Sequence, residues 1–393
     1  ALELSSREIY YSNILMALNY TDKASCVDIY QKHRDWALMF GNSCAQTNNL
    51  TNNPDPDRQL RIGYVSADFR EHPVASFIEP IFSYHNKKKF HITCYSSTVN
   101  SDRKTTHLRG LVSKWRDVLN LSDEQVINLV MNDGIDLLVD LSGHTAGNRL
   151  KVFSQKPAPI QITYLGYPNT TGISAIDYRL TDSWADPPGM TDQYNREILS
   201  RLPHGFLCYQ PPDDAPDVCP CPYLHTGHIT FGSFNNLAKI MPPVIEAWAS
   251  ILKKIPDAKL VIKTRPFADF ATRNVYKFRF EKAGIDPNRV DLRQPTRTTT
   301  EHLSMYGDID IALDTFPYNG TTTTCEALWM GVPVIVLAGN SHAGRVGVSL
   351  LSQVGLNNYI AENVEDYIFK AISLAEHIEN KDHQRNTLRM VVS

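Results

Sequence analysis

The stretch Ile309-Asp-Ile-Ala-Leu-Asp-Thr-Phe-Pro-Tyr-Asn-Gly-Thr-Thr-Thr-Thr-Cys-Glu-Ala-Leu-Trp-Met-Gly-Val-Pro333 decides the fold, because three local signals agree along it. Residues 309–313 are short, apolar and β-branched, which predicts a strand. Residues 317–320 have turn composition, and residues 322–330 have helical composition up to Gly331, a common helix C-terminus. The order strand, loop, helix is typical of an α/β sheet.

The predicted helix begins inside the threonine run, where the backbone amides lack partners and the helix dipole is positive. Thr321, Thr322 and Thr323 would add hydroxyl donors, so this start suits an anion such as a diphosphate. Glu326 lies one turn further along and would reach ribose hydroxyls. The alternative is that the threonines only cap the helix and that Glu326 is a solvated acid.

The 393-residue chain is long enough for two domains. Its net charge is −3, and 21% of its residues are charged, which gives no basic surface for nucleic acid or for a membrane. No apolar run approaches the roughly 20 residues that span a bilayer, and the first residues lack the apolar core of a signal peptide. We therefore expect a cytoplasmic protein that binds neither nucleic acid nor membrane.

The seven cysteines are an odd, scattered set, which indicates reduced thiols rather than a disulfide framework. Only Cys219 and Cys221 are close together, and their spacing does not match the usual zinc patterns, although His225 and His228 follow. The pair Asp308-Ile-Asp310 begins a predicted strand, which is the wrong end for catalysis in a parallel sheet. We therefore expect no metal ion and no cofactor.

Three regions follow from periodicity and composition. Residues 1–45 have the apolar periodicity of two helices packed on another surface. Strand-like and helix-like segments alternate through residues 58–205 and again through 227–393, and turn-rich or proline-rich segments occupy 46–58 and 203–226. The predicted fold class is α/β, with two Rossmann-like, doubly wound parallel domains and a short N-terminal helical segment.

Polar side chains follow several predicted strands, and ligands bind beyond the carboxyl ends of strands in such sheets, so we expect them to line one cleft between the domains. Lys239 follows a strand closely and could neutralise the charge on a departing diphosphate. Asp68 and His72 follow the first strand and could accept a proton from a hydroxyl nucleophile. The alternatives are that Lys239 is a surface lysine and that His72 and His144 are structural.

Two common nucleotide-binding signatures are missing from the sequence. No Gly-x-Gly-x-x-Gly follows a predicted strand, and there is no Gly-Lys-Ser or Gly-Lys-Thr loop. The first is typical of dinucleotide redox enzymes and the second of P-loop phosphoryl transfer. Their absence argues against both reactions.

Four separated motifs carry a family resemblance. They are Arg61-Ile-Gly-Tyr-Val-Ser-Ala-Asp-Phe69 with His72-Pro73, Pro157-Ala-Pro-Ile-Gln161 with Leu165-Gly-Tyr-Pro168, Phe231-Gly-Ser-Phe-Asn-Asn-Leu-Ala-Lys239, and residues 314–333. Together they closely resemble the catalytic region of the protein O-GlcNAc transferase family, including the SPINDLY-type protein O-fucosyltransferases. The similarity runs from about residue 60 nearly to the C-terminus.

The resemblance implies a metal-independent GT-B fold, in which two Rossmann-like domains face a cleft and the second holds most of the nucleotide sugar. It also implies tetratricopeptide repeats before the catalytic region, so that residues 1–45 would be the transition from them. The implied reaction moves GlcNAc from UDP-GlcNAc, with inversion, onto Ser or Thr hydroxyls of proteins or peptides.

Three alternatives to this reaction stay open. GDP-fucose could be the donor, as in a protein O-fucosyltransferase, because residues 235–239 and 321–326 look closer to the SPINDLY type. A nucleotide-sugar epimerase of GT-B fold would need the same diphosphate site. A non-catalytic scaffold could retain only a peptide-binding surface.

The resemblance also implies roles for individual residues. Lys239 matches the lysine that contacts the donor diphosphate, and Glu326 matches the acid that holds the ribose. Asn236 stands where the animal enzymes have glutamine, and Thr321 to Thr323 match their phosphate-binding His-Thr-Thr. The residues that fall near the base are Arg297 and His302, and those that surround the sugar are Asp68, His72, Pro73, Leu165, Gly166 and Pro168.

Overall fold

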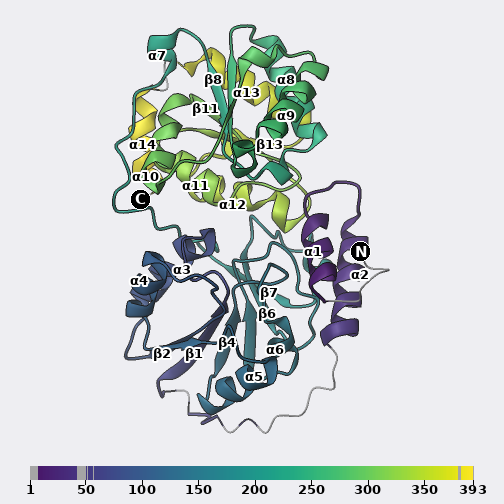
Figure 1. The fold of residues 1–393 in the computed structure, drawn as a ribbon, viewed down its shortest axis with the longest axis vertical. Coiled ribbons are helices and arrows are strands. Elements are labelled where there is room, and N and C mark those ends of the chain that lie inside the picture. The colour runs from purple at the N-terminus through teal and green to yellow at the C-terminus, as the bar shows by residue number, and fades with distance from the viewer. Residues whose placement is uncertain (1–7, 42–49, 51, 56, 379–381, 393) are drawn as a thin grey trace. The chain divides into compact units, whose positions relative to one another are not determined.

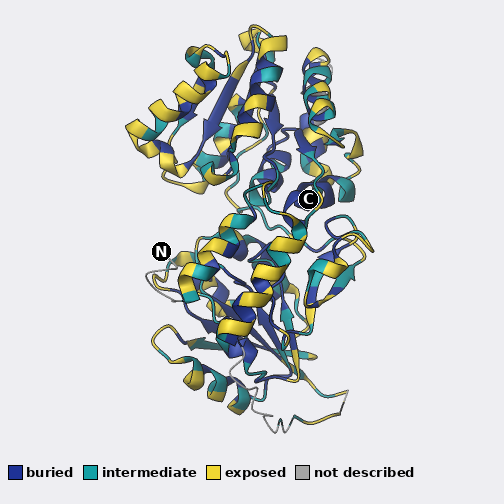
Figure 2. Ribbon diagram, turned by 90° about the vertical axis from the view of Figure 1, so that its right-hand side faces the viewer, coloured by how far each residue is buried: buried dark blue, intermediate teal, exposed yellow. Residues whose placement is uncertain are grey.

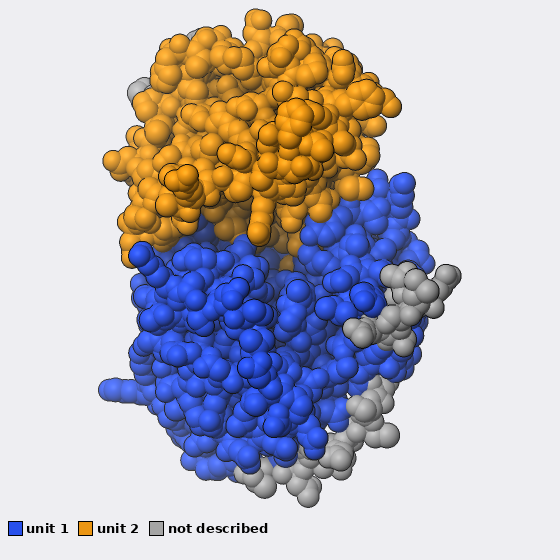
Figure 3. Space-filling view, in the orientation of Figure 1, with its two compact units in different colours: residues 1–210 blue, residues 211–393 orange. Residues whose placement is uncertain are grey.

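The computed structural model describes residues 8–41, 50, 52–55, 57–378 and 382–392 (Figure 1). The chain divides into two compact units, residues 1–210 and 211–393 (Figure 3). The predicted helical segment 1–45 belongs to the first unit, although its ends and part of the predicted linker at 46–58 lie outside the described residues.

The first unit contains a seven-stranded, wholly parallel sheet in the order β3-β2-β1-β4-β5-β6-β7. Helices connect most of these strands (Figure 1). The strands are β1 (Leu60–Ser66), β2 (Phe90–Ser96), β3 (Lys114–Asp117), β4 (Leu137–Asp140), β5 (Ile160–Thr163), β6 (Tyr178–Asp182) and β7 (Ile198–Leu202). The helices are α3 (Pro73–Tyr84), α4 (Arg103–Leu111), α5 (Asp123–Asn132) and α6 (Leu150–Ser154), with the 3₁₀ turn η2 (Asp192–Tyr194).

Two N-terminal helices, α1 (Glu8–Leu18) and α2 (Cys26–Trp36), pack on the loops of the first unit, and α2 continues into the π-helical turn η1 (Ala37–Gly41). His144 is structural here, because its Nε2 donates to Thr171 O (2.9 Å) and its Nδ1 lies 3.2 Å from Ser12 Oγ. Burial lowers the pKa of His144 well below its usual value. The structural alternative for His144 is therefore the correct one.

The second unit contains a six-stranded parallel sheet in the order β10-β9-β8-β11-β12-β13. The strands are β8 (Thr230–Ser233), β9 (Lys259–Lys263), β10 (Val290–Arg293), β11 (Ile311–Leu313), β12 (Val334–Leu337) and β13 (Ile360–Ala361). The α-helices are α7 (Tyr223–Thr226), α8 (Pro242–Lys254), α9 (Phe270–Lys282), α10 (Thr299–Ser304), α11 (Thr322–Trp329), α12 (Val346–Gln353), α13 (Val364–Glu376) and α14 (Asp382–Val392). The 3₁₀ turns are η3 (Leu237–Lys239), η4 (Arg265–Ala268), η5 (Pro287–Arg289), η6 (Met305–Asp308), η7 (His342–Gly344) and η8 (Asn357–Tyr359).

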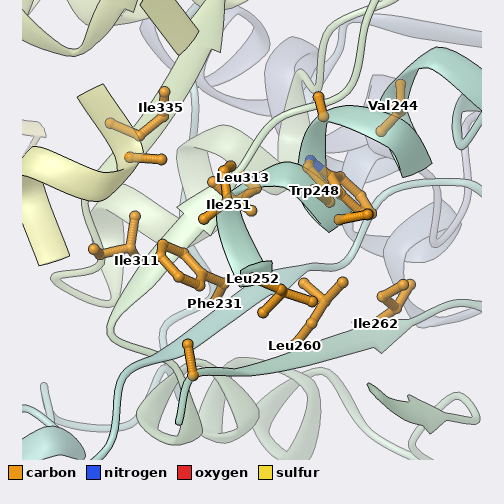
Figure 4. Packing of buried hydrophobic residues seen from close by; sticks show 14 of the residues in the cluster. Phe231, Val244, Trp248, Ile251, Leu252, Leu260, Ile262, Ile311, Leu313 and Ile335 are labelled. Carbon is orange, nitrogen blue, oxygen red and sulfur yellow. The ribbon is translucent and has the colours of Figure 1, made fainter. Parts of the chain in front are cut away.

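The core of the second unit forms where α8 lies against the sheet (Figure 4). Trp248 and Ile251 of α8 are fully buried and pack with Phe231 of β8 and Leu260 of β9. An apolar stripe at helical spacing is expected to bury in this way. In both units the central strands are buried, whereas the outward faces of the helices carry many of the exposed residues (Figure 2).

The strand that opens the deciding stretch is shorter than predicted, since β11 begins at Ile311 and not at residue 309. Asp310 stands just before it, fully buried, and its carboxylate accepts hydrogen bonds from the thiol of Cys221 (2.8 Å) and from Thr230 N (2.8 Å). Cys221 therefore has a structural hydrogen bond. In the described part of the chain no three His, Cys, Asp or Glu side chains gather as metal ligands would.

None of the helices that the described residues form is long and apolar enough to cross a bilayer.

Candidate active site

The central strands of the second unit bring two polar loops together. The strand order places β8 beside β11, and the connections from these two strands run to opposite sides of the sheet. This is the topological switch point, where open α/β sheets bind their ligands. The loop after β8 carries Asn235, Asn236 and Lys239, and the loop after β11 runs from Asp314 to the first turn of α11.

The Lys239 ammonium joins the two loops. Its Nζ donates to Asn319 O (2.6 Å) and lies 3.9 Å from the centre of the Tyr318 ring. Burial lowers the pKa of Lys239 to about 8, and the charge of Asp314 opposes that shift. Asn319 is one residue before Gly320 and two before Thr321, so the structure brings Lys239 to the start of the predicted anion-binding helix.

Asp314 holds the loop that leads into α11. Its Oδ1 accepts hydrogen bonds from Gly320 N (2.6 Å), Thr315 N (2.8 Å) and Asn235 Nδ2 (3.2 Å). Its Oδ2 is buried, and no hydrogen-bond donor among the described residues reaches it. Burial raises the pKa of Asp314 to about 6, against the lowering effects of Lys239 and these donors.

The first turn of α11 is built as predicted, with the helix beginning at Thr322. Thr321 occupies the N-cap position, but its side chain makes no capping hydrogen bond. The hydroxyl of Thr323 lies 3.1 Å from Asn235 Oδ1 across a small cavity that both residues line. A side chain at Gly320 would collide with Thr323 Oγ1 (2.6 Å) and Asp314 Oδ1 (2.9 Å), so only glycine fits this close approach.

Glu326 lies at the centre of a second cluster, one turn along α11. Its Oε2 is 2.9 Å from His302 Nε2 and 3.2 Å from the Tyr306 hydroxyl. The other ring nitrogen of His302 contacts the Lys263 ammonium. Phe234 closes the cluster, with its ring centre 4.5 Å from that of Tyr306 and 5.8 Å from that of His302. Glu326 is therefore not a solvated acid.

Lys263 and Tyr306 are residues of this cluster that the sequence did not predict, and Lys263 is the charged one. It ends β9, where it follows three buried apolar residues, and only 6% of its surface is exposed. Burial lowers the pKa of Lys263 to about 8, while the charge of Glu326 opposes the shift. A lysine directly after the apolar residues of a strand was the sequence signal that could have indicated Lys263 as a site residue.

Two predicted binding residues lie outside these clusters. Asn236 is exposed, and its Oδ1 accepts from Ala238 N (3.1 Å), which caps the η3 turn. Arg297 is also exposed, in the loop before α10, where its backbone N donates to Glu301 Oε2 (2.9 Å). Their predicted roles as ligand contacts stay predictions.

The first unit places Asp68 and His72 together at its own switch point, after β1. His72 is the N-cap of α3, and its Nδ1 accepts from Val74 N (3.3 Å), so a neutral ring carries its proton on Nε2. That Nε2 lies 3.8 Å from Asp68 Oδ1, and Arg70 Nη2 lies 3.5 Å from the same oxygen. The pKa of His72 is lowered by burial and by Arg70, against the effect of Asp68.

The remaining residues predicted around the sugar divide between two loops of the first unit. Pro73 is the first residue of α3, beside His72, a position that suits its fixed φ. Leu165 follows β5 in the left-handed region, with φ of 64°. A side chain at Gly166 would meet Leu141 O at 1.9 Å, and Pro168 is buried. Close backbone approach and strain at a strand end are common where a ligand binds.

The two sheets and the polar loops at their switch points define an α/β glycosyltransferase of the GT-B type. More specifically, the chain belongs to glycosyl transferase family 41, whose model matches residues 29–210 and 223–392. The family resemblance seen in the sequence motifs is thereby confirmed.

Two plant proteins and one solved structure illustrate the relationship. The chain is 44% identical, over 97% of its length, to a probable UDP-N-acetylglucosamine–peptide N-acetylglucosaminyltransferase SPINDLY from Petunia hybrida. It is 32% identical, over 81% of its length, to the probable transferase SEC of Arabidopsis thaliana, of which it covers 33%. A mutant O-GlcNAc transferase from Thermobaculum terrenum superposes with a TM-score of 0.95 at 39% identity, covering all of this chain and 74% of that one.

The chain spans about two fifths of the SPINDLY relatives that it matches, 41% of the Petunia protein. The comparisons therefore establish the family and the fold of the matched region. The activity of the whole protein is a separate question.

Proposed function

We propose that this chain is the catalytic region of a protein glycosyltransferase that moves GlcNAc from UDP-GlcNAc onto Ser or Thr hydroxyls. The observation that carries the proposal is the convergence of the Lys239 ammonium and the start of α11 on the short loop 314–321. An ammonium, a helix N-terminus and threonine hydroxyls together suit a diphosphate. The names of the SPINDLY and SEC relatives, both described as probable UDP-N-acetylglucosamine–peptide N-acetylglucosaminyltransferases, support the donor and the peptide acceptor.

In this proposal a single displacement transfers the sugar with inversion at the anomeric carbon. The acceptor oxygen forms a bond to that carbon while the bond to the diphosphate breaks. The hydroxyl proton passes to the pair formed by Asp68 and His72. The diphosphate takes the electron pair, and its new charge is stabilised by Lys239 and by Thr321, Thr322 and Thr323 at the start of α11. Because these groups supply positive potential, the reaction would need no divalent metal.

Calorimetry with UDP and GDP tests the donor class. The proposal expects tighter binding of UDP, with Glu326 holding the ribose in either case. Tighter binding of GDP would replace UDP-GlcNAc by GDP-fucose as the donor and keep the rest of the mechanism. Failure of both nucleotides to bind would instead favour a non-catalytic scaffold.

A transfer assay tests the reaction. Chain, UDP-GlcNAc and a Ser/Thr peptide are incubated with and without EDTA, and the peptide mass and the anomeric configuration of its sugar are measured. We expect one added N-acetylhexosamine of inverted configuration at equal rates in both samples. Loss of the transfer rate in the presence of EDTA would show that the reaction depends on a metal ion. Conversion of the donor without any modified peptide would indicate an epimerase.

A further inference from the structure

We infer that Lys263 is a positioning residue that acts through His302 to aim the carboxylate of Glu326 at the ribose hydroxyls of the bound nucleotide. This inference deepens the proposed function and rests on it. It follows from the chain of contacts that runs from β9 through α10 to α11.

The contacts fix the proton positions along this chain. An ammonium has only donors, so His302 Nδ1 must accept the hydrogen bond from Lys263. A neutral imidazole then carries its single proton on Nε2, which donates to Glu326 Oε2 over 2.9 Å. With methionine at position 263, nothing in this contact would prevent the proton from moving to Nδ1, which would leave two acceptors facing each other at Glu326.

The same contacts divide the two oxygens of Glu326 between the protein and a ligand. Oε2 receives both His302 Nε2 and the Tyr306 hydroxyl, the latter at 3.2 Å. Among the described residues, no donor is directed to Oε1 of Glu326. A carboxylate held by one oxygen presents the other as an acceptor, and two vicinal hydroxyls of a ribose are donors of the right kind.

The packing around Lys263 holds the Lys263–His302–Glu326 contacts in place. Lys263 is 6% exposed, its ammonium lies 5.5 Å from the centre of the Phe234 ring, and the same ring packs on His302 and Tyr306. A buried lysine loses hydration, so it is kept where a partner uses its charge. Lys263 therefore has a specific partner in His302 and is not a solvated strand end.

The first test compares ribonucleotides with their dideoxy counterparts by calorimetry on the full 393-residue chain. Lys263→Met should raise the Kd of UDP, or of GDP if that binds more tightly, about tenfold, because a charge-assisted hydrogen bond to the ribose is weakened. The Kd of the 2′,3′-dideoxynucleotide should stay within about twofold, because it lacks both hydroxyls. Equal losses for both nucleotides would overturn the inference and indicate a structural role.

Two variants serve as controls for this comparison. Lys259→Met removes an exposed lysine at the other end of β9 and should leave both Kd values unchanged. Lys263→Arg keeps a permanently protonated donor and should restore the preference for the ribonucleotide. In a Glu326→Ala background, Lys263→Met should have no further effect, and an additional loss there would contradict action through Glu326.

The second test needs no nucleotide, so it separates this inference from the proposed function. In ¹⁵N-histidine spectra of the free chain, His302 should show an unprotonated Nδ1, and Lys263→Met should shift that signal. A His302 signal that Lys263→Met leaves unchanged would overturn the inference even if the chain transfers sugar. Absence of nucleotide binding with an intact His302 signal would contradict the proposed function alone.

Discussion

The two units place one buried aspartate each at the same point of their sheets, yet they use it differently. Asp140 ends β4 beside β1, and Asp314 follows β11 beside β8. Burial raises the pKa of both carboxyls to about 6. In the first unit, Ser142 N, Gly143 N and Thr163 Oγ1 donate to Asp140 and satisfy both of its oxygens. In the second unit, Oδ2 of Asp314 has no donor in the described part of the chain.

The difference teaches which of the two buried aspartates supports only its own loop and which supports the chemistry. A buried carboxylate that the protein satisfies completely stabilises a loop and does little else. A buried carboxylate with an unpaired oxygen costs stability, and such a cost is usually retained where a charge is needed. Here the neighbouring charge is Lys239, whose protonation Asp314 favours. We therefore expect substitutions around Asp314 to affect transfer and matching ones around Asp140 to affect folding.

The largest effect is expected for Lys239→Met. Removing the ammonium next to the diphosphate site should lower kcat about a thousandfold, the size typical of a lost electrostatic contact in a transition state. Far-ultraviolet circular dichroism and thermal unfolding should show an intact fold. Lys254→Met, at an exposed position of α8, is the matched control and should transfer sugar normally. Full activity of Lys239→Met would show that the switch point of the second unit does not supply a charge needed for transfer.

The two aspartates themselves provide the next test. Asp140→Asn puts an amide where Gly143 N and Thr163 Oγ1 donate, so we expect a loss of about 2 kcal/mol in the free energy of unfolding. Asp314→Asn keeps the acceptor for Gly320 N and Asn235 Nδ2 and removes a buried charge, so its stability should be equal or higher. Urea titration of both variants measures the contrast. Similar losses in both would mean that the two carboxylates have the same role.

The sequence predicted the fold where elements have long, regular patterns. The stripe of α8 and the turn chemistry before α11 were sufficient, because burial and backbone geometry are local there. The strands β3, β7 and β13 were not predicted. β3 is the charged segment Lys-Trp-Arg-Asp, β7 is the half-exposed segment Ile-Leu-Ser-Arg-Leu, and β13 has only two residues, so the sheet and not the local sequence makes them strands.

The candidate site was predictable in part for the same reason. Lys239, Thr322 and Glu326 follow or begin elements that the sequence defines, so their position at strand ends and at the helix start could be predicted. Lys263 reaches His302, 39 residues away, only through the packing of β9 against α10, and local patterns do not report that. The unpaired oxygen of Asp314 likewise depends on the folded loop.

A smaller effect concerns the alkaline side of the pH profile. Lys239 should act only when protonated. We therefore expect kcat/KM to be highest below the pKa of Lys239 and to fall as pH rises through about 8. Asp314→Asn removes the negative charge that raises this pKa, so the alkaline fall in kcat/KM should move to lower pH by about one unit. Asp140→Asn should leave the pH of this fall unchanged. An unshifted fall in Asp314→Asn would show that Asp314 does not support the charge of Lys239.

The smallest effect separates two threonines that differ in burial and in what their hydroxyls contact. Thr163 Oγ1 donates to Asp140 Oδ2 (2.8 Å) in the first unit, and Thr323 Oγ1 donates to Asn235 Oδ1 (3.1 Å) in the second. Valine has the same shape without the hydroxyl, so each Thr→Val substitution removes one hydrogen bond, which is worth about 1 kcal/mol where it is buried. Thr163→Val should lose that amount from the free energy of unfolding and keep the Kd of UDP unchanged.

Thr323→Val should show the reverse pattern. Thr323 is partly exposed beside the start of α11, so the unfolding free energy should change little, while the Kd of the nucleotide rises about fivefold. Urea titration and calorimetry on the same two variants measure both quantities. If Thr163→Val weakened nucleotide binding as much as Thr323→Val, both switch points would take part in holding the donor. The division into scaffold and chemistry would then be wrong for the diphosphate, even if Lys239 proved essential.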